Sequence, residues 1–426
     1  MMENSYKRRI ADKLLQEQLE TVGAILLQGP KWCGKTTTAS QTAASILYMD
    51  DPRMLQSNML LAETNPELLL QGDTPRLIDE WQLAPTLWDA VRYTVSRRGI
   101  PGQFIFTGSA VPPDLSKIKH TGTGRFAWIT MRPMSLWESG ESNGAVSLSE
   151  LFQGRAVSAI SAPMDVGRLS FLVCRGGWPG SLVLSEKAAL RQANNYVDAV
   201  VGSDISRVDA VNRDATFARR LLRSYARHQG TQVSVATLYS DLVVNSRASM
   251  STDTIYDYLN ALKMIFVVED MEAWSPNLRS KTAIRTSDTR YFVDPSIAAS
   301  AMGIGPDDLL KDLPTLGLLF ESLAVRDLRV YADALDGRVY HYRDKNGLEC
   351  DAVLHLRDGR YGLVEIKLGG DTLIESGAAT LKSLAAKVDV DKMNPPSFMM
   401  VLTGVGTYAY LRPDGVMVVP IASLRD

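Results

Sequence analysis

The sequence predicts an α/β protein of two or three domains, with a helix-wrapped parallel sheet first, a helical region next and a mixed α/β segment last. Short apolar segments alternate with helical patterns over residues 8–130, which is typical of a parallel sheet. Helical patterns then dominate from 150 to 264. At 426 residues the chain is also too long for one core, since single cores stop growing at roughly 250–300 residues.

The expected elements fall into three groups along the chain. Strands of the first domain cover residues 24–28, 46–49, 76–78, 103–106 and 127–130, and a Ser/Gly-rich stretch at 138–144 closes that domain. Helices at 217–228, 235–243 and 252–264 with a strand at 265–270 follow the order of a winged helix-turn-helix. Strands at 339–342, 350–356 and 361–366 belong to the last group. We therefore expect domains at residues 1–145, 146–286 and 287–426.

Composition narrows the class of protein. Apolar residues make up 45% and charged residues 22% of the chain, with a net charge of −2, so any basic surface must be local. The three cysteines, Cys33, Cys174 and Cys350, are too sparse for a disulfide framework or a zinc cluster. The apolar stretch 23–27 is far shorter than the ~20 residues of a membrane span, and the basic start lacks a signal-peptide core. We expect a cytoplasmic protein without a membrane partner.

A glycine-rich loop lies between the first expected strand and a helix. Gly29 and Gly34-Lys35-Thr36 fit the pattern G-x-x-x-x-G-K-[ST], whose backbone N–H groups cradle nucleotide phosphates. Lys35 would reach the β- and γ-phosphates, and the Thr36 hydroxyl would bind Mg²⁺. A chance glycine loop is the alternative, but the position between strand and helix is the one the mechanism needs. The predicted nucleotide contacts are Gly29, Pro30, Lys31, Trp32, Cys33, Gly34, Lys35, Thr36 and Thr37.

Carboxylates and hydroxyls follow two later strands. Asp79 ends the strand at 76–78 and could hold Mg²⁺, and Glu80 could polarise the attacking water. Alternatively, both residues cap the next helix. Thr107 or Ser109 could sense the γ-phosphate, or could simply form a turn at the strand end. Arg125 follows a flexible turn and is either an arginine finger for the nucleotide of a neighbouring subunit or a surface arginine.

These motifs together resemble the AAA-type ATPases of bacteria and archaea that carry a C-terminal domain of unknown function. The resemblance covers nearly the whole chain and rests on segments 29–36, 78–82, 106–109, 124–125, 176–179 and 204–205. It implies ATP binding, a central helical or winged-helix region and a C-terminal domain related to restriction-endonuclease-like folds. Trp32 and Cys33 depart from the family pattern, where arginine and small residues are commoner, while Lys31 keeps a cation.

An acidic pair and a lysine stand out in the last domain. Asp351 begins one strand, and Glu365 and Lys367 end the next, where alternation places both on one face. Two carboxylates and a lysine can hold a divalent cation and activate water against a phosphodiester. The set is similar to the D…ExK active site of restriction-like nucleases, and Glu321 could add a third carboxylate. The alternative is a solvated salt-bridge face.

Local basic clusters make DNA a candidate partner. They comprise Arg219, Arg220, Arg223 and Arg227 on one helix, and Arg279, Lys281 and Arg285 in a following loop. Such residues could contact phosphates, although a solvated helix face explains the first cluster equally well. The leading hypothesis is a homo-oligomeric ATPase that uses ATP and Mg²⁺ and couples nucleotide state to nucleic-acid engagement, with metal-dependent nuclease activity in its last domain. Its rival is a nucleotide-switched scaffold with an inactive nuclease-like domain.

Overall fold

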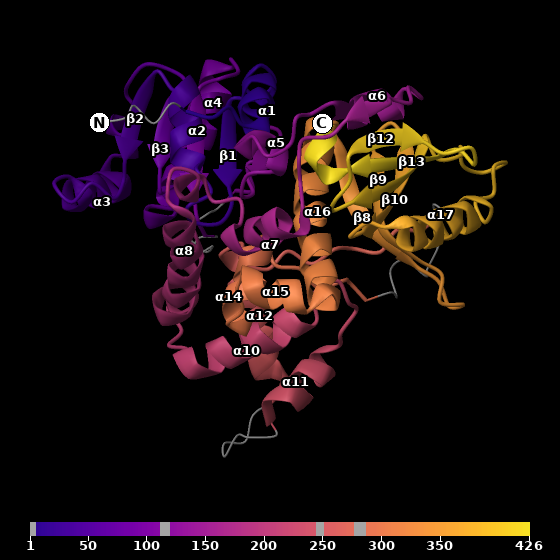
Figure 1. Ribbon diagram of the computed structural model, residues 1–426. Helices are drawn as coiled ribbons and strands as arrows, with labels where there is room; N and C mark the ends of the chain where they lie inside the picture. Colours follow the sequence, from indigo (N-terminus) through magenta and orange to yellow (C-terminus); the bar gives the residue numbers. More distant parts are fainter. Residues whose placement is uncertain (1–5, 111–119, 244–250, 277–286) are drawn as a thin grey trace. The chain divides into compact units, whose positions relative to one another are not determined.

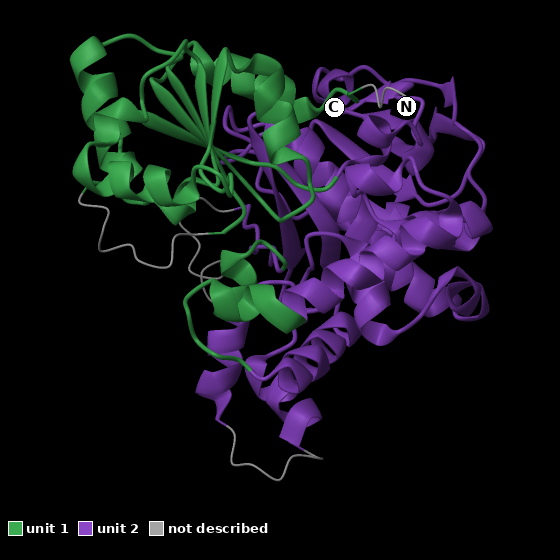
Figure 2. Cartoon of the chain, turned by 90° about the vertical axis from the view of Figure 1, so that its left-hand side faces the viewer, with its two compact units in different colours: residues 1–133, 202–213, 260–267 green, residues 134–201, 214–259, 268–426 purple. Residues whose placement is uncertain are grey.

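The computed structural model describes residues 6–110, 120–243, 251–276 and 287–426, which form two compact units (Figures 1 and 2). The first unit comprises Met1–Pro133, Gly202–Arg213 and Asn260–Val267. The second comprises Met134–Val201, Asp214–Leu259 and Val268–Asp426. The middle of the chain thus contributes segments to both units. The fold class is α/β, as predicted, whereas the three predicted domain ranges stay a prediction.

The first unit is a parallel five-stranded sheet with helices on both faces (Figure 2). Its elements are α1 (Ile10–Leu19), β1 (Ala24–Gln28), α2 (Lys35–Thr42), β2 (Ser45–Tyr48), α3 (Leu55–Thr64), β3 (Arg76–Asp79), α4 (Thr86–Arg98), β4 (Phe104–Gly108) and β5 (Phe126–Thr130), with α9 (Ile205–Arg207) from the middle of the chain. The sheet order is β2-β3-β4-β1-β5. The five predicted strands are therefore confirmed, and β4 lies between the strands that lead to the phosphate loop and to Asp79.

Alternation along β1 separates the two cores of this unit. Ile25 and Leu27 pack in one cluster with Leu15 of α1 and Ala39 of α2. Leu26 packs on the other face, in the cluster that holds Trp88 of α4 and residues of α3. Strands that are apolar on both faces are typical of a parallel sheet covered on both sides. The carboxyl ends of the strands, where polar residues begin, form the edge that carries the site.

The second unit contains a seven-stranded mixed sheet in the order β7-β12-β13-β11-β10-β9-β8. Its strands are β7 (Ala159–Ile160), β8 (Gly337–Arg343), β9 (Glu349–Leu356), β10 (Tyr361–Lys367), β11 (Phe398–Thr403), β12 (Tyr408–Leu411) and β13 (Val416–Pro420); β6 (Val146–Ser147) pairs separately with β14 (Leu424–Arg425). The three strands predicted near 339, 350 and 361 are confirmed. Helix α17 (Asp371–Ala385) covers one face, where its Leu381 packs with Val353, Leu363 and Val401.

Helices make up the rest of the second unit (Figure 1). They are α5 (Leu136–Ser139), α6 (Leu148–Phe152), α7 (Val166–Arg175), α8 (Glu186–Ala199), α10 (Ala215–Arg227), α11 (Val235–Val243), α14 (Pro295–Met302), α15 (Pro306–Lys311) and α16 (Leu313–Ala334); α12 (Thr252–Met264) continues into the first unit. No helix among these and the other described residues is both long and apolar enough to cross a membrane.

The strand expected at 265–270 is wrong. The N–H groups of Phe266 and Val267 instead donate to the carbonyls of Lys263 and Leu262, and Phe266 is left-handed with φ 58°. This is the Schellman motif that ends a helix, so the apolar run caps α12 instead of extending. Beyond it, two isolated antiparallel bridges join Val268 to Phe292 and Met271 to Thr289. The three predicted helices are present, and the winged helix remains a prediction.

The Gly-Gly-Trp-Pro segment at 176–179 has a structural role in the second unit. A Cβ on Gly177 would lie 2.2 Å from the carbonyl oxygen of Met134, so only glycine fits there. The Gly177 N–H donates to Asp294 over 2.9 Å, and Asp294 in turn accepts from Arg326 over 2.8 Å. Arg326 also binds Asp327 over 2.7 Å. This buried network of one arginine and two aspartates ties distant parts of the unit together.

Candidate functional site

The loop between β1 and α2 requires its two glycines. Gly29 has φ 149°, and a Cβ there would lie 2.0 Å from the carbonyl oxygen of Met131. Gly34 is left-handed with φ 98° and is the N-cap of α2. Both positions are strained for any residue with a side chain. The sequence therefore folds the loop tightly against the start of a helix, which is the geometry of a phosphate cradle.

Lys35 is buried inside this loop. Its ammonium group donates to the carbonyl oxygens of Gly29 over 3.0 Å and Pro30 over 2.7 Å, and 6% of the residue is exposed. Because backbone carbonyls satisfy the charge here, phosphate oxygens could replace them without further desolvation. Thr37, two residues later, is exposed, and its carbonyl accepts from the Gln41 side chain over 3.2 Å.

Asp79 joins the loop to the neighbouring strand. The Thr36 hydroxyl donates to Asp79 Oδ1 over 2.8 Å, and the Thr107 hydroxyl donates to the same oxygen. Strand register explains the convergence, because Asp79 and Thr107 are partners on adjacent parallel strands. The structure thus brings to Asp79 two hydroxyls that lie 43 positions before it and 28 positions after it in the sequence. One carboxylate and one hydroxyl are the protein ligands that Mg²⁺ needs beside nucleotide phosphates, so these residues fit a magnesium ion.

Glu80 adopts a conformation that is rare for residues other than glycine. Its φ is 53° and its ψ 44°, and such strain clusters at active sites. The Gln82 amide and, at 3.5 Å, the Ser109 hydroxyl both approach its Oε2. Burial is the main cause that raises the pKa of Glu80, and the charge of Asp79 adds to it. A raised pKa makes the carboxylate a stronger base. Sequence reasoning gave no role to Gln82, which orients this glutamate.

The remaining loop residues have different surroundings. Lys31 donates to Asp204 over 2.7 Å, and Trp32 is left-handed with φ 67° and 46% exposed. Cys33 is fully buried, and its carbonyl accepts from the Arg9 side chain over 2.8 Å. The Cys33 thiol donates to the Met131 carbonyl over 3.4 Å, so it too supports the loop. Arg9 was missed, because a lone charge outside a motif gives no signal in the sequence, and Asp204 was noted only as part of the family resemblance, without a role at the loop.

Arg125 lies at the other end of the sheet. The residue after it, Phe126, is the strand partner of Ala24 at the start of β1, whereas the phosphate loop follows the end of β1. Five residues of strand at ~3.3 Å each separate the two ends by roughly 15 Å. The Arg125 guanidinium donates to the Ser96 hydroxyl over 3.2 Å. Arg125 is therefore not part of the phosphate site of its own chain, and a role at a neighbouring chain stays a prediction.

The predicted acidic pair and lysine of the second unit converge. Strands β9 and β10 form an antiparallel hairpin in which Val364 pairs with Ala352. Lys367 Nζ lies 2.6 Å from Glu365 Oε2 and 3.0 Å from Asp351 Oδ2. The backbone N–H of Ile366 also donates to Asp351 over 2.7 Å. With 5% of the Glu365 side chain exposed, this acid–lysine cluster of Asp351, Glu365 and Lys367 is not a solvated face.

Glu321 is the further carboxyl of this neighbourhood. The Tyr291 hydroxyl donates to it, and burial, together with the charge of Asp351, raises the pKa of Glu321 to about 8. The same two causes raise the pKa of Glu365. Lys367 lies against the other two carboxylates, so we assign the retained proton to Glu321.

Metal binding at the acid–lysine cluster would require a rearrangement. Two carboxylates suffice for Mg²⁺, which keeps several waters, but here the lysine ammonium lies between them. Within the described ranges, no group of three or more His, Cys, Asp or Glu side chains is arranged to hold a metal ion.

The predicted basic surface is partly neutralised where it is described. On α10, Arg219 pairs with Asp198 at 2.8 Å, Arg227 lies 3.9 Å from Asp241, and Arg220 donates to the Leu242 carbonyl, while Arg223 is exposed. Arg279, Lys281 and Arg285 lie outside the described residues. The amphipathic helix instead buries Leu221, Leu222 and Tyr225.

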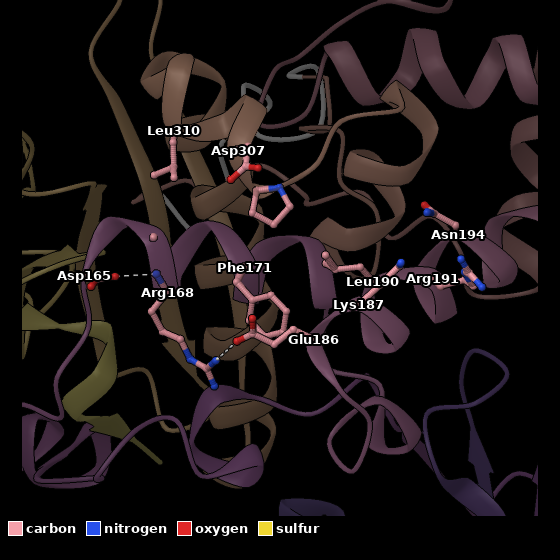
Figure 3. Close-up of a pocket in the computed structure, with 12 residues that line it drawn as sticks. Asp165, Arg168, Phe171, Glu186, Lys187, Leu190, Arg191, Asn194, Asp307 and Leu310 are labelled. Atoms are coloured by element: carbon pink, nitrogen blue, oxygen red, sulfur yellow. Dashed lines mark hydrogen bonds and ion pairs between the residues drawn. The ribbon is translucent and has the colours of Figure 1, made fainter.

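The second unit also holds a pocket of about 820 Å³ between α7, α8 and α15 (Figure 3). Figure 3 shows Phe171 among the lining side chains, with the Arg168 guanidinium near Glu186, at 3.5 Å. The charged lining comprises Arg168, Lys187 and Arg191 against Asp165, Glu186 and Asp307. Because the two signs balance, the lining selects neither an anion nor a cation.

Three segments of the chain match known families. Residues 22–139 match the family described as an AAA domain, 167–308 match a domain of unknown function (DUF8612), and 316–424 match another (DUF4143). Two uncharacterized proteins, from Mycobacterium tuberculosis and Mycobacterium bovis, are each 25% identical over 365 residues, which cover 85% of this chain and 74% of theirs.

Solved structures with some similarity include a Walker-type ATPase of Pyrococcus abyssi, with 14% identity, a TM-score of 0.43 and coverage of 70% of this chain and 97% of that one. The Orc1 protein of Aeropyrum pernix in complex with DNA has 10% identity, a TM-score of 0.25 and coverage of 73% and 95%. The match of residues 22–139 to the AAA-domain family agrees with the geometry of the phosphate loop and of the Thr36–Asp79 contact in the same segment.

Proposed function

We propose that this chain binds ATP with Mg²⁺ and hydrolyses it. The observation that carries the proposal is the convergence of Thr36 and Thr107 on one carboxylate oxygen of Asp79, next to a loop that buries Lys35. In P-loop ATPases, an aspartate at the end of a strand and the hydroxyl of the phosphate loop hold Mg²⁺. The AAA-domain match over 22–139 supports the same activity.

Each side chain has one task in the proposed reaction. Lys35 exchanges its two carbonyl acceptors for phosphate oxygens, and Thr36 with Asp79 holds Mg²⁺, which neutralises charge on the phosphates. Gln82 and Ser109 both approach Glu80 Oε2, so Oε1 is the oxygen that takes a proton from the attacking water. Thr107, released from Asp79, contacts the γ-phosphate.

We further infer that nucleotide state controls the engagement of nucleic acid by the second unit, with Asp351, Glu365 and Lys367 as a metal-dependent phosphodiester-cleaving set. The support is the convergence of these three side chains at one hairpin, within 3.0 Å of the lysine nitrogen. Asp351 and Glu365 would hold the Mg²⁺ ion, which would supply the charge that activates water against a phosphodiester, once Lys367 had moved from its place between them. Arg223 and the predicted cluster of Arg279, Lys281 and Arg285, which lies outside the described residues, would supply phosphate contacts.

A nucleotide-switched scaffold, which binds a protein partner or a second copy of the chain, is the second candidate. The observation that favours it is the position of Lys367, whose ammonium binds both carboxylates and occupies the place a metal ion needs. Arg219 and Arg227 of α10, which lie near acidic side chains, also favour the scaffold.

Fluorescence anisotropy with labelled single- and double-stranded DNA separates the two candidates. Nucleic-acid engagement predicts binding that weakens steeply with salt and that differs between ATP-bound and ATP-free protein. The Lys35→Ala variant should lose the ATP effect and keep the basal binding. Incubation with Mg²⁺ or Mn²⁺ should cut the DNA in the wild type and not in Asp351→Asn. If the protein shows no salt-dependent DNA binding with or without ATP, nucleic-acid engagement is rejected and the scaffold is the remaining candidate.

A further inference from the structure

A segment from the middle of the chain contacts the phosphate loop. Lys31 Nζ lies 2.7 Å from Asp204 Oδ1, with 46% of the lysine side chain and 10% of the aspartate side chain exposed. Both residues belong to the first unit, to which residues 202–213 return after a long excursion through the second. Lys31, the exposed cation of the loop, thus pairs with the largely buried carboxylate of Asp204. Asp204 therefore fixes the direction in which the Lys31 side chain points.

The 202–213 segment is built to hold that carboxylate in place. Arg213 donates to the Ile205 carbonyl over 2.7 Å and to both oxygens of Asp209 over 2.6 Å. Its backbone N–H donates to the Ser206 hydroxyl over 3.0 Å. These bonds close the segment into a compact turn. Asp204 itself ends a π-helix, Val200–Asp204, a rare geometry that frequently marks functional sites.

A triphosphate and Asp204 would compete for the same ammonium group. Lys31 is one of the two lysines in the phosphate loop, and the ATP phosphates concentrate negative charge where the loop N–H groups converge. Lys35 is already satisfied inside the loop, whereas Lys31 reaches outward to Asp204. Binding of phosphate therefore draws Lys31 inward and removes the partner of a buried carboxylate, which is unfavourable unless the carboxylate moves as well.

The 202–213 segment leads directly into α10, so a movement of Asp204 would be passed along the chain to that helix. The segment ends at Arg213, and the next residue, Asp214, is the N-cap of α10, where it accepts from the Phe217 N–H over 2.5 Å. Only ten residues of chain therefore separate Asp204 from the first helix of the following part of the second unit.

We propose that the Lys31–Asp204 ion pair reads the nucleotide state: Asp204 holds Lys31 when the site is free, and the phosphates of ATP break the pair and release the 202–213 segment. Asp204 is a positioning residue, and this inference rests on the proposed ATP binding. In this proposal the 202–213 segment is the element that passes the nucleotide state to α10.

Calorimetric titration with Mg²⁺–ATP tests the competition. Asp204→Asn should tighten ATP binding about three- to tenfold, and Lys31→Met should weaken it. In the Lys31→Met background the Asp204→Asn change should have little effect, because the competed ammonium is gone. Asp204→Glu should restore affinity toward that of the wild type. Asp73→Asn, which removes an exposed carboxylate of the same unit, is the matched control and should leave the affinity unchanged.

Hydrogen exchange tests the release. ATP should speed exchange of amides in residues 202–213 and at the start of α10 in the wild type, and Asp204→Asn should show the faster exchange with or without ATP. If Asp204→Asn binds ATP as the wild type does, with the same exchange response, the inference fails and the ATPase proposal stands. If the wild type binds no ATP while folded, both fail.

Discussion

Removal of the lysine from the acid–lysine cluster should destabilise the second unit. Lys367→Met keeps the aliphatic stem but deletes two charge-assisted contacts, of 2.6 Å to Glu365 and 3.0 Å to Asp351. Loss of one partner from a buried ion pair costs about 3–5 kcal/mol. The lower end applies because about a fifth of the Asp351 and Lys367 side chains is exposed, at 20% and 22%. A loss of about 3 kcal/mol corresponds to roughly a hundredfold faster local unfolding of the strand, if the rate at which the strand refolds stays the same.

Hydrogen exchange of the β10 amides measures this loss locally, which avoids assuming two-state unfolding of a two-unit chain. At pH 8 the amides of Lys367→Met should exchange about a hundredfold faster than those of the wild type. At pH 5 the difference should shrink, because the pKa of Glu365 is raised and its protonation removes one of the two uncompensated charges. Lys382→Met is the control, since its pair with Asp414 is 46% exposed on the lysine side and such pairs contribute about 0–1 kcal/mol.

Equal exchange in Lys367→Met and the wild type at pH 8 would refute this reasoning, because it would mean that water already solvates the two carboxylates. The same variant separates the candidate functions. If Asp351 and Glu365 can hold a metal ion, excess Mg²⁺ should restore protection of β10 in Lys367→Met. If the cluster is a structural ion pair, Mg²⁺ should not.

Three further predictions follow from single side chains. Burial raises the pKa of Glu321 from its usual value of 4.5 to about 8, so its contribution to stability is complete below pH 4.5 and is lost as the pH rises through 8. Glu321→Gln should therefore flatten the fall in melting temperature between pH 4.5 and 8. Glu349→Gln, which changes an exposed residue, should leave that fall unchanged. Arg326→Met, which removes the cationic partner of two buried aspartates, should destabilise the second unit by about 3–5 kcal/mol, measured locally by hydrogen exchange of the α16 amides. If Arg125 completes the site of a neighbouring chain, mixtures of Arg125→Ala and Lys35→Ala proteins should recover ATPase activity that neither has alone; inactive mixtures would remove Arg125 from the mechanism.

The first unit could be predicted because its determinants are local in the sequence. The glycine–lysine–threonine loop, the apolar strands and the residues that end them are each continuous segments, and parallel pairing brings the strand ends together at one edge. Thr107 and Asp79 end adjacent strands and meet at this edge, although their direct contact was not itself predicted. The hairpin that aligns Asp351 with Glu365 was predictable for the same reason.

The missed features depend on contacts between distant segments. Arg9 and Asp204 support the phosphate loop from 24 and 173 residues away, and a single charged residue carries no periodicity. The strand expected at 265–270 failed because an apolar run is ambiguous between a strand and a helix end, and Phe266 took the left-handed cap position that glycine usually fills. The lysine between Asp351 and Glu365 likewise depends on side-chain geometry that spacing cannot give.

Phosphate release from ATP by the wild type, Lys35→Ala and Glu80→Gln tests the central claim most directly. The account predicts that the wild type hydrolyses ATP in the presence of Mg²⁺ and that Lys35→Ala fails to bind it. Glu80→Gln should bind ATP as tightly as the wild type and turn it over about 10²- to 10⁴-fold more slowly, since it lacks the proton acceptor. Full turnover by Glu80→Gln would remove Glu80 from the mechanism, and ATP binding by Lys35→Ala at wild-type affinity would contradict the assignment of the phosphate loop.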